Sequence, residues 1–321
     1  RLYQILPALS RTCVIIKGTT TMKEDIMNIK LVRAQARQLQ LQHPKVFSYF
    51  ALPTFLTILA SYMLTGTDIT EALAHMELRE GMLFLLSRQI FPAIIGFILS
   101  FLYLGATFRF LISASSKGEK NFGIFTIFQS QYFTSAFLTL FIKQVILSLW
   151  GGLLYVSQLL LTVVSYHVLA INESSSTTST LRADTPEVQA ILKLAPTMTT
   201  GLLMALVGLL LFLPFYYQYS LVELILYSRL MTGTYDGPMS ILRQSKEEMK
   251  GFKSHRLVLD LSLLGWQILS FFTLGMANFY VKPYTTSCQI IFYHTLLQKR
   301  MQADSRFQQK APDLPKSNPL D

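Results

Sequence analysis

The sequence predicts an all-α, polytopic helical membrane protein with about six transmembrane helices and additional amphipathic helices at the membrane surface. Its 321 residues are 51% hydrophobic and only 14% charged, whereas about a quarter of the residues in a soluble domain are charged. The mean hydropathy is correspondingly positive, at +0.39. Several apolar stretches also reach the roughly 20 residues that a helix needs to cross a bilayer.

The chain before the first apolar stretch divides into two parts. Residues 1–21 show no helical period and stop just before Met22, so we expect a translated leader or a disordered segment there. Residues 22–45 are expected to contain an amphipathic cytoplasmic helix that ends near Pro44. Its apolar stripe recurs at spacings of three and four, and its cations occupy another face: Ile29, Val32, Ala36 and Leu39, then Lys30, Arg33 and Arg37. An interfacial helix and a solvated leader helix both fit this pattern.

The predicted transmembrane domain covers residues 46–298 and is followed by a disordered cytoplasmic tail over 299–321. Its apolar segments are 46–64, 90–112, 133–171, 198–227, 257–280 and a shorter sixth helix that follows Pro283-Tyr284 and reaches Leu297. The third segment is too long for one straight crossing, so either Gly151-Gly152 bends it or its early part lies at the interface. The sixth helix can span, re-enter or lie at the interface, because about 14 residues are too few for a full crossing.

The connections between these segments have distinct compositions. A helix along the outer surface is predicted over 67–80, where Asp68 and Glu71 resemble a capping box. Residues 172–190 form a Ser/Thr-rich outer loop that we expect to be disordered. Pro214 should kink the fourth span, because it removes a backbone donor and crowds the preceding turn.

The distribution of Lys and Arg predicts that both termini are cytoplasmic. With an even number of spans, the N-terminal helix, the second loop, the segment 229–256 and the tail collect most of these cations on one side. The other side receives Arg79, Arg88, Arg182, Lys193 and Lys282. The same clustering beside apolar spans argues against nucleic acid as the partner of a chain whose formal charge is +10.

The basic cytoplasmic elbow, residues 229–256, joins the fourth and fifth spans. Four of its cations recur at spacings of three, four and three, as on one face of a helix: Arg243, Lys246, Lys250 and Lys253. Each cation close to an anionic leaflet contributes about 1 kcal/mol of binding. The elbow therefore either fixes the topology or recognises a lipid headgroup or a membrane-protein partner.

Residues 245–293 carry an ordered series of motifs: Ser245–Lys253, Leu259–Trp266, Thr273–Gly275, Pro283-Tyr284 and Phe292-Tyr293. Together they resemble the bacterial integral membrane family catalogued as domain of unknown function 975. That family is distantly similar to the membrane domain of some glycerophosphodiester phosphodiesterases, which implies a lipid-related context. The resemblance rests on Gly251, Ser262, Gly265, Trp266, Gly275, Pro283, Tyr284 and Tyr293.

Recognisable catalytic and cofactor motifs are absent from the sequence. It has no phosphate-binding glycine loop, no dinucleotide fingerprint and no zinc motif. The two cysteines and five histidines are scattered. We therefore expect no enzyme activity, no cofactor and no metal site.

Four ionisable residues are predicted to lie near the cytoplasmic ends of spans three to five: Lys143, Glu223, Arg229 and Asp260. Charges within a membrane are costly and often form pairs or line pathways. Either these side chains cap helices at the interface, or they form an inward-facing cluster in which Glu223 pairs with Lys143 or Arg229.

The sequence thus favours a non-enzymatic scaffold or envelope-homeostasis factor in the bacterial cytoplasmic (plasma) membrane, with a basic elbow that contacts anionic phospholipid headgroups or a protein partner. The alternative is a transporter or permease for a small or amphipathic molecule, with its path near Pro214 and Glu223.

Overall fold

The computed structural model describes residues 28–65, 78–115, 123–174 and 186–310, and within these ranges it contains helices and turns but no strand. The predicted all-α class is confirmed. The elements are α2 (Ile29–Gln42), α3 (Val46–Thr65), α5 (Leu78–Ala114), the 3-10 helix η2 (Ile124–Phe128), α6 (Ser130–Trp150), α7 (Gly152–Ser174), α8 (Pro186–Gln218), α9 (Val222–Met231), α10 (Pro238–Glu248), α11 (Lys253–Phe272) and α12 (Asn278–Lys310).

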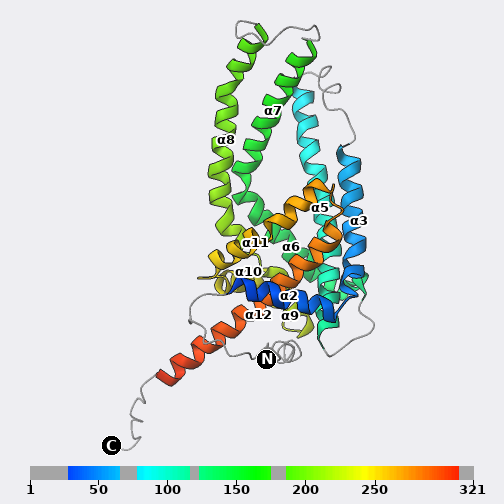
Figure 1. Cartoon of the computed structure of the whole chain (residues 1–321), viewed down its shortest axis with the longest axis vertical. Helices are drawn as coiled ribbons and strands as arrows, with labels where there is room; N and C mark the ends of the chain where they lie inside the picture. The colour runs from blue at the N-terminus through cyan, green and yellow to red at the C-terminus, as the bar shows by residue number, and fades with distance from the viewer. Residues whose placement is uncertain (1–27, 66–77, 116–122, 175–185, 311–321) are drawn as a thin grey trace, which may run out of the picture.

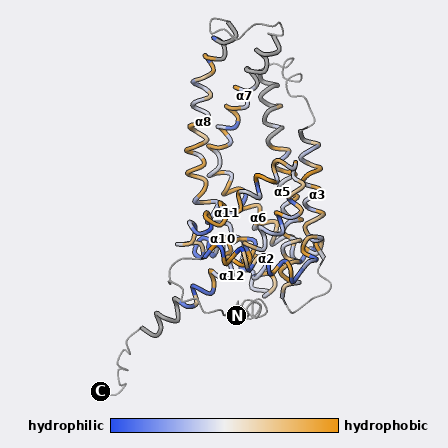
Figure 2. Tube along the Cα trace, in the orientation of Figure 1, coloured by the Kyte–Doolittle hydropathy of each residue, from blue (hydrophilic) through white to orange (hydrophobic). Residues whose placement is uncertain are grey.

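The helices form a bundle that is broader at one end (Figure 1). α3, α5, α7 and α8 run along its long axis, while α2, α9, α10 and the α11–α12 hairpin gather in its lower half. Hydrophobic residues dominate the long helices, and hydrophilic residues collect at the lower end, along α2, α10 and α12 (Figure 2). This separation of long apolar helices from a polar end of the bundle is the pattern expected of a protein embedded in a bilayer.

Within the described residues, four helical stretches are long and apolar enough to cross a membrane: Val46–Met63, Ile90–Ala114, Ser130–Trp150 and Leu192–Met231. In each of these stretches, no more than a third is buried inside the protein. Their many outward apolar side chains suit a hydrocarbon environment, so the chain is a membrane protein. The predicted number of about six spans is not confirmed.

The predicted third segment, 133–171, consists of two helices separated at Gly151. α6 ends where Trp150 stacks on Phe215 of α8, with ring centroids 3.6 Å apart. α7 then runs back along α8 (Figure 1). Gly208 and Gly201 of α8 face Leu154 and Leu161 of α7, with contacts of 3.1 Å from the position of a Cβ. Small residues let the two helix backbones approach closely, as is common in membranes.

The fourth predicted span also differs from expectation. α8 continues through Pro214 to Gln218, and a break at residues 219–221 divides the predicted span. The Ser220 hydroxyl donates to the Tyr217 carbonyl across this break (2.9 Å). α9 then runs as a separate, mostly buried helix.

The α11–α12 hairpin replaces the predicted fifth and sixth spans. α11 stops at Phe272 instead of residue 280, because Leu274 and Gly275 adopt positive φ angles of 50° and 87°. α12 begins at Asn278, before Pro283 instead of after it. A Cβ on Gly275 would lie 3.2 Å from Ile58 of α3.

This contact sets the depth of the hairpin turn. Ile58 lies 12 residues into α3 from Val46, which corresponds to about 18 Å along a helix axis. The turn therefore reaches the middle of α3, and Phe271, Phe272 and Leu274 beside it are 80%, 77% and 87% exposed. A fully crossing fifth helix is not observed.

Several predicted segments fall partly or wholly outside the described residues. The proposed leader 1–21 and most of the outer helix 67–80 lie outside them, as does the middle of the loop 172–190. α12 continues to Lys310, so the first part of the segment 299–321 is helical, and 311–321 are not described.

The N-terminal amphipathic helix packs inward. Val32, Ala36 and Leu39 of the predicted stripe are at most 4% exposed, and α2 lies against α12. The Asn28 side chain caps its first turn by accepting from the backbone N–H groups of Lys30 and Leu31. The largest buried side chains of the core belong to α3, α5 and α12: Phe50, Phe108, Phe110, Tyr284 and Phe292.

Gly105 of α5 provides a test of this packing. A Cβ at Gly105 would overlap the Ile124 carbonyl of η2, whose carbon lies 3.2 Å away, whereas a Cβ at Gly96 of the same helix meets nothing within 4 Å. We expect Gly105→Ala to destabilise the protein by about 1–3 kcal/mol through overpacking. Gly96→Ala should be neutral or stabilising. Thermal unfolding of both variants in mild detergent measures this difference, and equal melting temperatures would contradict the packing of η2 on α5.

Candidate functional site

The basic elbow, residues 229–256, contains the end of α9, a turn, α10, a second turn and the start of α11. α10 stops at Glu248, and Met249–Phe252 form a turn in which Gly251 has a φ of 85°. Lys253 is the first residue of α11. The predicted single helical face for Arg243, Lys246, Lys250 and Lys253 is therefore wrong, because α10 ends before Lys250 and the turn at Gly251 separates it from Lys253 of α11.

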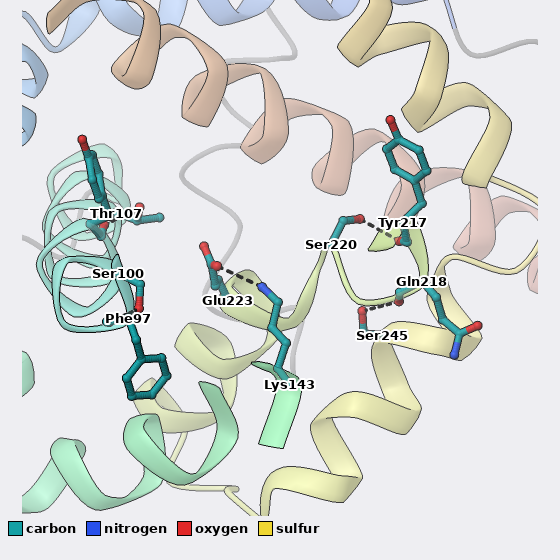
Figure 3. Close-up of polar contacts among 10 residues, drawn as sticks. Phe97, Ser100, Thr107, Lys143, Tyr217, Gln218, Ser220, Glu223 and Ser245 are labelled. Atoms are coloured by element: carbon teal, nitrogen blue, oxygen red, sulfur yellow. Dashed lines mark hydrogen bonds and ion pairs between the residues drawn. The ribbon is translucent and has the colours of Figure 1, made fainter. Parts of the chain in front are cut away.

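Buried contacts hold α10 and the turn against α8. Ser245 is fully buried, and its hydroxyl donates to the Gln218 carbonyl (2.8 Å; Figure 3). The Lys253 ammonium donates to the side-chain Oε1 of the same Gln218 (3.2 Å). Met249 is also fully buried. The elbow is thus anchored at the break that follows α8.

Arg300 of α12 holds the turn from the other side. Its Nη2 donates to the carbonyls of Glu247 (2.7 Å), Glu248 (2.9 Å) and Lys250 (3.2 Å). Its Nε also lies 3.1 Å from the Glu248 carboxylate. The Glu247 and Glu248 carbonyls belong to the last turn of α10, where a helix leaves carbonyls without i+4 partners. Arg300 therefore fixes the C-terminal end of α10.

The remaining elbow cations face outward. Arg243, Lys246 and Lys250 are exposed, and none of them forms an ion pair with an acidic residue in the part of the chain that the structure describes. Lys253 differs from them, since its ammonium is bound to Gln218. The elbow therefore presents three exposed cations that form no ion pair among the described residues, on a backbone that is fixed from two sides.

Lys143 of α6 and Glu223 of α9 form an ion pair with a distance of 3.1 Å from Nζ to Oε1 (Figure 3). This is one of the two pairings that the sequence left open for Glu223. The other candidate, Arg229, instead binds the Gln244 side chain at 3.0 Å and lies 3.7 Å from Asp236. Arg229 therefore ties α9 to α10.

Lys282 joins this region from α12. The distribution of cations predicted that Lys282 lies on the outer side. In the structure, its ammonium lies 5.6 Å from the centre of the Tyr103 ring in α5. The Glu223 carboxylate interacts electrostatically with this ammonium. The Tyr103 hydroxyl in turn lies 3.4 Å from the hydroxyl of Thr54 in α3. Lys282 therefore lies within α12 beside α5, and not in a loop between two spans.

The fourth predicted residue, Asp260, pairs with Arg256 one helical turn earlier (3.4 Å). Tyr217 of α8 also hydrogen-bonds the Asp260 carboxylate. Arg256 is only 3% exposed, and its Nε and Nη1 atoms have no hydrogen-bond partner within the described residues. The sequence counted Arg256 only as an elbow cation, although its spacing of four from Asp260 signals the pair.

The family model described as "Protein of unknown function (DUF975)" matches residues 22–300 of this chain. The chain belongs to this family. No curated protein and no solved structure matches the chain. The distant similarity to the phosphodiesterase membrane domain is not confirmed.

The residues that carry the DUF975 resemblance shape the elbow and the hairpin. Gly251 and Gly275 supply the positive φ of the two turns. Trp266 packs its ring against Tyr280 and Tyr284, with centroids 5.2 Å and 6.3 Å away. Pro283 lies within α12, and Tyr293 of the same helix is 6% exposed. On α11, the Ser262 hydroxyl donates to the Leu259 carbonyl, and a Cβ at Gly265 would meet no atom within 4 Å.

Metal-binding clusters of three or more His, Cys, Asp or Glu residues do not occur in the described ranges. His294 on α12 is 7% exposed, and burial lowers the pKa of its imidazole. The ring is therefore neutral at pH 7, since the ordinary histidine pKa already lies below that value.

The Lys143–Glu223 pair can be tested by a double-mutant cycle. Lys143→Met and Glu223→Gln should each lower the melting temperature, because each leaves one charged group without its partner. The double variant should lose less than the sum of the two, with a coupling above about 0.5 kcal/mol.

The Arg229–Asp236 pair is the matched control, since its atoms are 3.7 Å apart and the Asp236 side chain is 69% exposed. Exposed pairs of this kind contribute little, so we expect near-additive effects there. Additive effects at both pairs would show that Lys143 and Glu223 do not interact.

Proposed function

We propose that this DUF975 protein is a non-enzymatic membrane scaffold whose elbow binds anionic phospholipid headgroups at the cytoplasmic leaflet of the bacterial plasma membrane. One observation carries the proposal. Arg243 and Lys246 of α10 and Lys250 of the following turn are exposed and form no ion pair among the described residues, on a backbone that Ser245 and Arg300 hold in place.

The magnitude of the electrostatic attraction supports this role. Each cation at the surface of an anionic leaflet contributes about 1 kcal/mol, so three contribute about 3 kcal/mol, or roughly a hundredfold in affinity. Little of this is lost in ordering the backbone, because Arg300 already binds the turn carbonyls. Preorganised sites retain more of their interaction energy.

The distribution of polar helices supports the proposed orientation. α2 and the C-terminal half of α12 lie at the same end of the bundle as α10 of the elbow (Figure 1). Basic residues beside spans favour the cytoplasmic side. We therefore propose that both ends of the chain face the cytoplasm, and that a membrane-protein partner can join at the same surface.

A transporter is the second candidate, favoured by the Lys143–Glu223 pair and the nearby Lys282. Charges held between membrane helices often mark substrate or proton pathways. Proteoliposome uptake of an amphipathic cation such as tetraphenylphosphonium, abolished by Glu223→Gln, would support this alternative over the scaffold.

The elbow is tested by native mass spectrometry of the purified protein in mild detergent with a mixture of phosphatidylglycerol and phosphatidylcholine. The wild type should retain phosphatidylglycerol preferentially. In the variant Arg243→Gln/Lys246→Gln/Lys250→Gln, the preference for phosphatidylglycerol over phosphatidylcholine should fall about 10- to 100-fold, because three surface cations are removed.

The control is Arg37→Gln/Lys45→Gln/Lys193→Gln, which removes the same charge from exposed positions outside the elbow. This control should keep most of the preference. An equal loss in both triple variants would mean that net charge, and not the elbow, attracts the lipid.

A further inference from the structure

We propose that one polar face of α7 is the contact surface of a homodimer, in which α7 packs in parallel against α7 of a second copy of this chain within the membrane. This surface, which we call the α7 seam, consists of Tyr155, Gln158, Thr162 and Ser165. It does not depend on the proposed lipid binding by the elbow, because the seam and the elbow share no residue.

The spacing of the α7 seam is the spacing of a helix–helix contact. Its residues recur at intervals of three, four and three, as in two helices that pack side by side. α7 uses the same spacing one residue earlier, in a series that α8 covers: Leu154, Ser157, Leu161 and Val164. Gly208 and Gly201 of α8 face the two leucines of that series, and Ser157 and Val164 are 3% and 5% exposed.

The α7 seam, by contrast, is open. It is rotated about 100° around the helix from the series that α8 covers, because a helix has 3.6 residues per turn. Tyr155 is 47% exposed, Gln158 and Ser165 are also exposed, and Thr162 is half-buried. α7 packs along α8 (Figure 1) and contacts α6, and no other helix in the described ranges packs extensively against it.

Gln158 lies at the depth of the hydrocarbon. It follows Leu154 by one turn and precedes Leu161, so it is level with the part of α8 between Gly208 and Gly201. On that part of α8, a stretch apolar enough to cross a membrane, several leucines face outward. Leu202, Leu203 and Leu206 are 51%, 58% and 56% exposed.

The Gln158 carboxamide is the group in the seam that needs a partner. The Thr162 hydroxyl donates to the Gln158 carbonyl (2.8 Å), and the Ser165 hydroxyl donates to the Leu161 carbonyl (2.8 Å), so both are satisfied within the helix. The Gln158 side chain forms no hydrogen bond among the described residues. A polar group that faces hydrocarbon without a hydrogen bond is costly.

The chemistry of a carboxamide selects a second copy as the partner. It carries both a donor and an acceptor, so two Gln158 side chains can each donate to the Oε1 of the other. A two-fold axis along the membrane normal places identical residues of two parallel helices opposite one another. Thr162 and Ser165 are small enough to let the two backbones approach, and hydrogen bonds between such side chains join helices in membranes.

Disulfide cross-linking in native membranes tests the position of the seam. In a Cys13→Ser/Cys288→Ala background, Thr162→Cys should form a disulfide-linked dimer when copper phenanthroline is added. Val156→Cys is the matched control, because Val156 is 46% exposed and lies more than about 100° around the helix from Thr162. The control should remain monomeric. Equal cross-linking of both variants would indicate random collision and would contradict the seam.

The role of Gln158 is tested by the association of the full-length protein in mild detergent, measured by analytical ultracentrifugation at several protein-to-detergent ratios. Gln158→Leu should raise the dissociation constant of the dimer about tenfold, because the reciprocal hydrogen bonds are lost. Gln158→Asn keeps a carboxamide and should recover part of this loss. Val156→Leu should leave the dissociation constant unchanged.

Three results would overturn the proposal. The first is a protein that is monomeric at every ratio, with no cross-link at Thr162→Cys. The second is a dimer whose dissociation constant is the same in Gln158→Leu as in the wild type. The third is labelling of Gln158→Cys in intact membranes by a membrane-impermeant maleimide, which would mean that the seam lines a water-filled path.

Discussion

The packing of the α11–α12 hairpin into the lower half of the bundle is the interaction on which the remaining structure depends. α12 lies against α2, α3 and α11 at once. It carries the buried Tyr284 and Phe292 on one face and Arg300 in its C-terminal half. Within a bilayer, helices associate through close van der Waals contact and interhelical hydrogen bonds. The hairpin supplies both, because its aromatic face fills the space beside α2 while Arg300 caps α10.

The hairpin also makes the two halves of the bundle chemically different. Its turn, with the highly exposed Phe271, Phe272 and Leu274, is suited to hydrocarbon and ends near the middle of α3. Its base joins the elbow and its cations. A helical hairpin keeps its backbone groups hydrogen-bonded, so it can enter a bilayer without crossing it. The cationic groups are thereby concentrated toward one surface of the membrane.

The sequence predicted the all-helical class, the spans 46–64 and 90–112, and the apolar stripe of α2, because long apolar runs and a period of three to four depend on local composition. It did not predict that this stripe packs against α12, since an interfacial and a solvated helix were the two expectations. It did not predict the breaks at residues 219–221 and 273–277. An apolar run has the same composition whether it forms one helix or two. The position of a helix break within it depends on tertiary contacts, such as that of Gly275 with Ile58. The pairing of Lys143 with Glu223 was foreseen as one option, while Lys282 and the unsatisfied Arg256 depend on the hairpin and were not.

The most direct test of the hairpin is the accessibility of Leu274. In a background with Cys13 and Cys288 replaced by serine and alanine, single cysteines at Leu274, Lys193 and Lys246 are treated with a membrane-impermeant maleimide from either side of the membrane. The hairpin predicts that Lys193→Cys and Lys246→Cys react from opposite sides, while Leu274→Cys reacts from neither. Labelling of Leu274→Cys from the same side as Lys193→Cys would mean that α11 crosses the whole membrane, and would contradict the central claim.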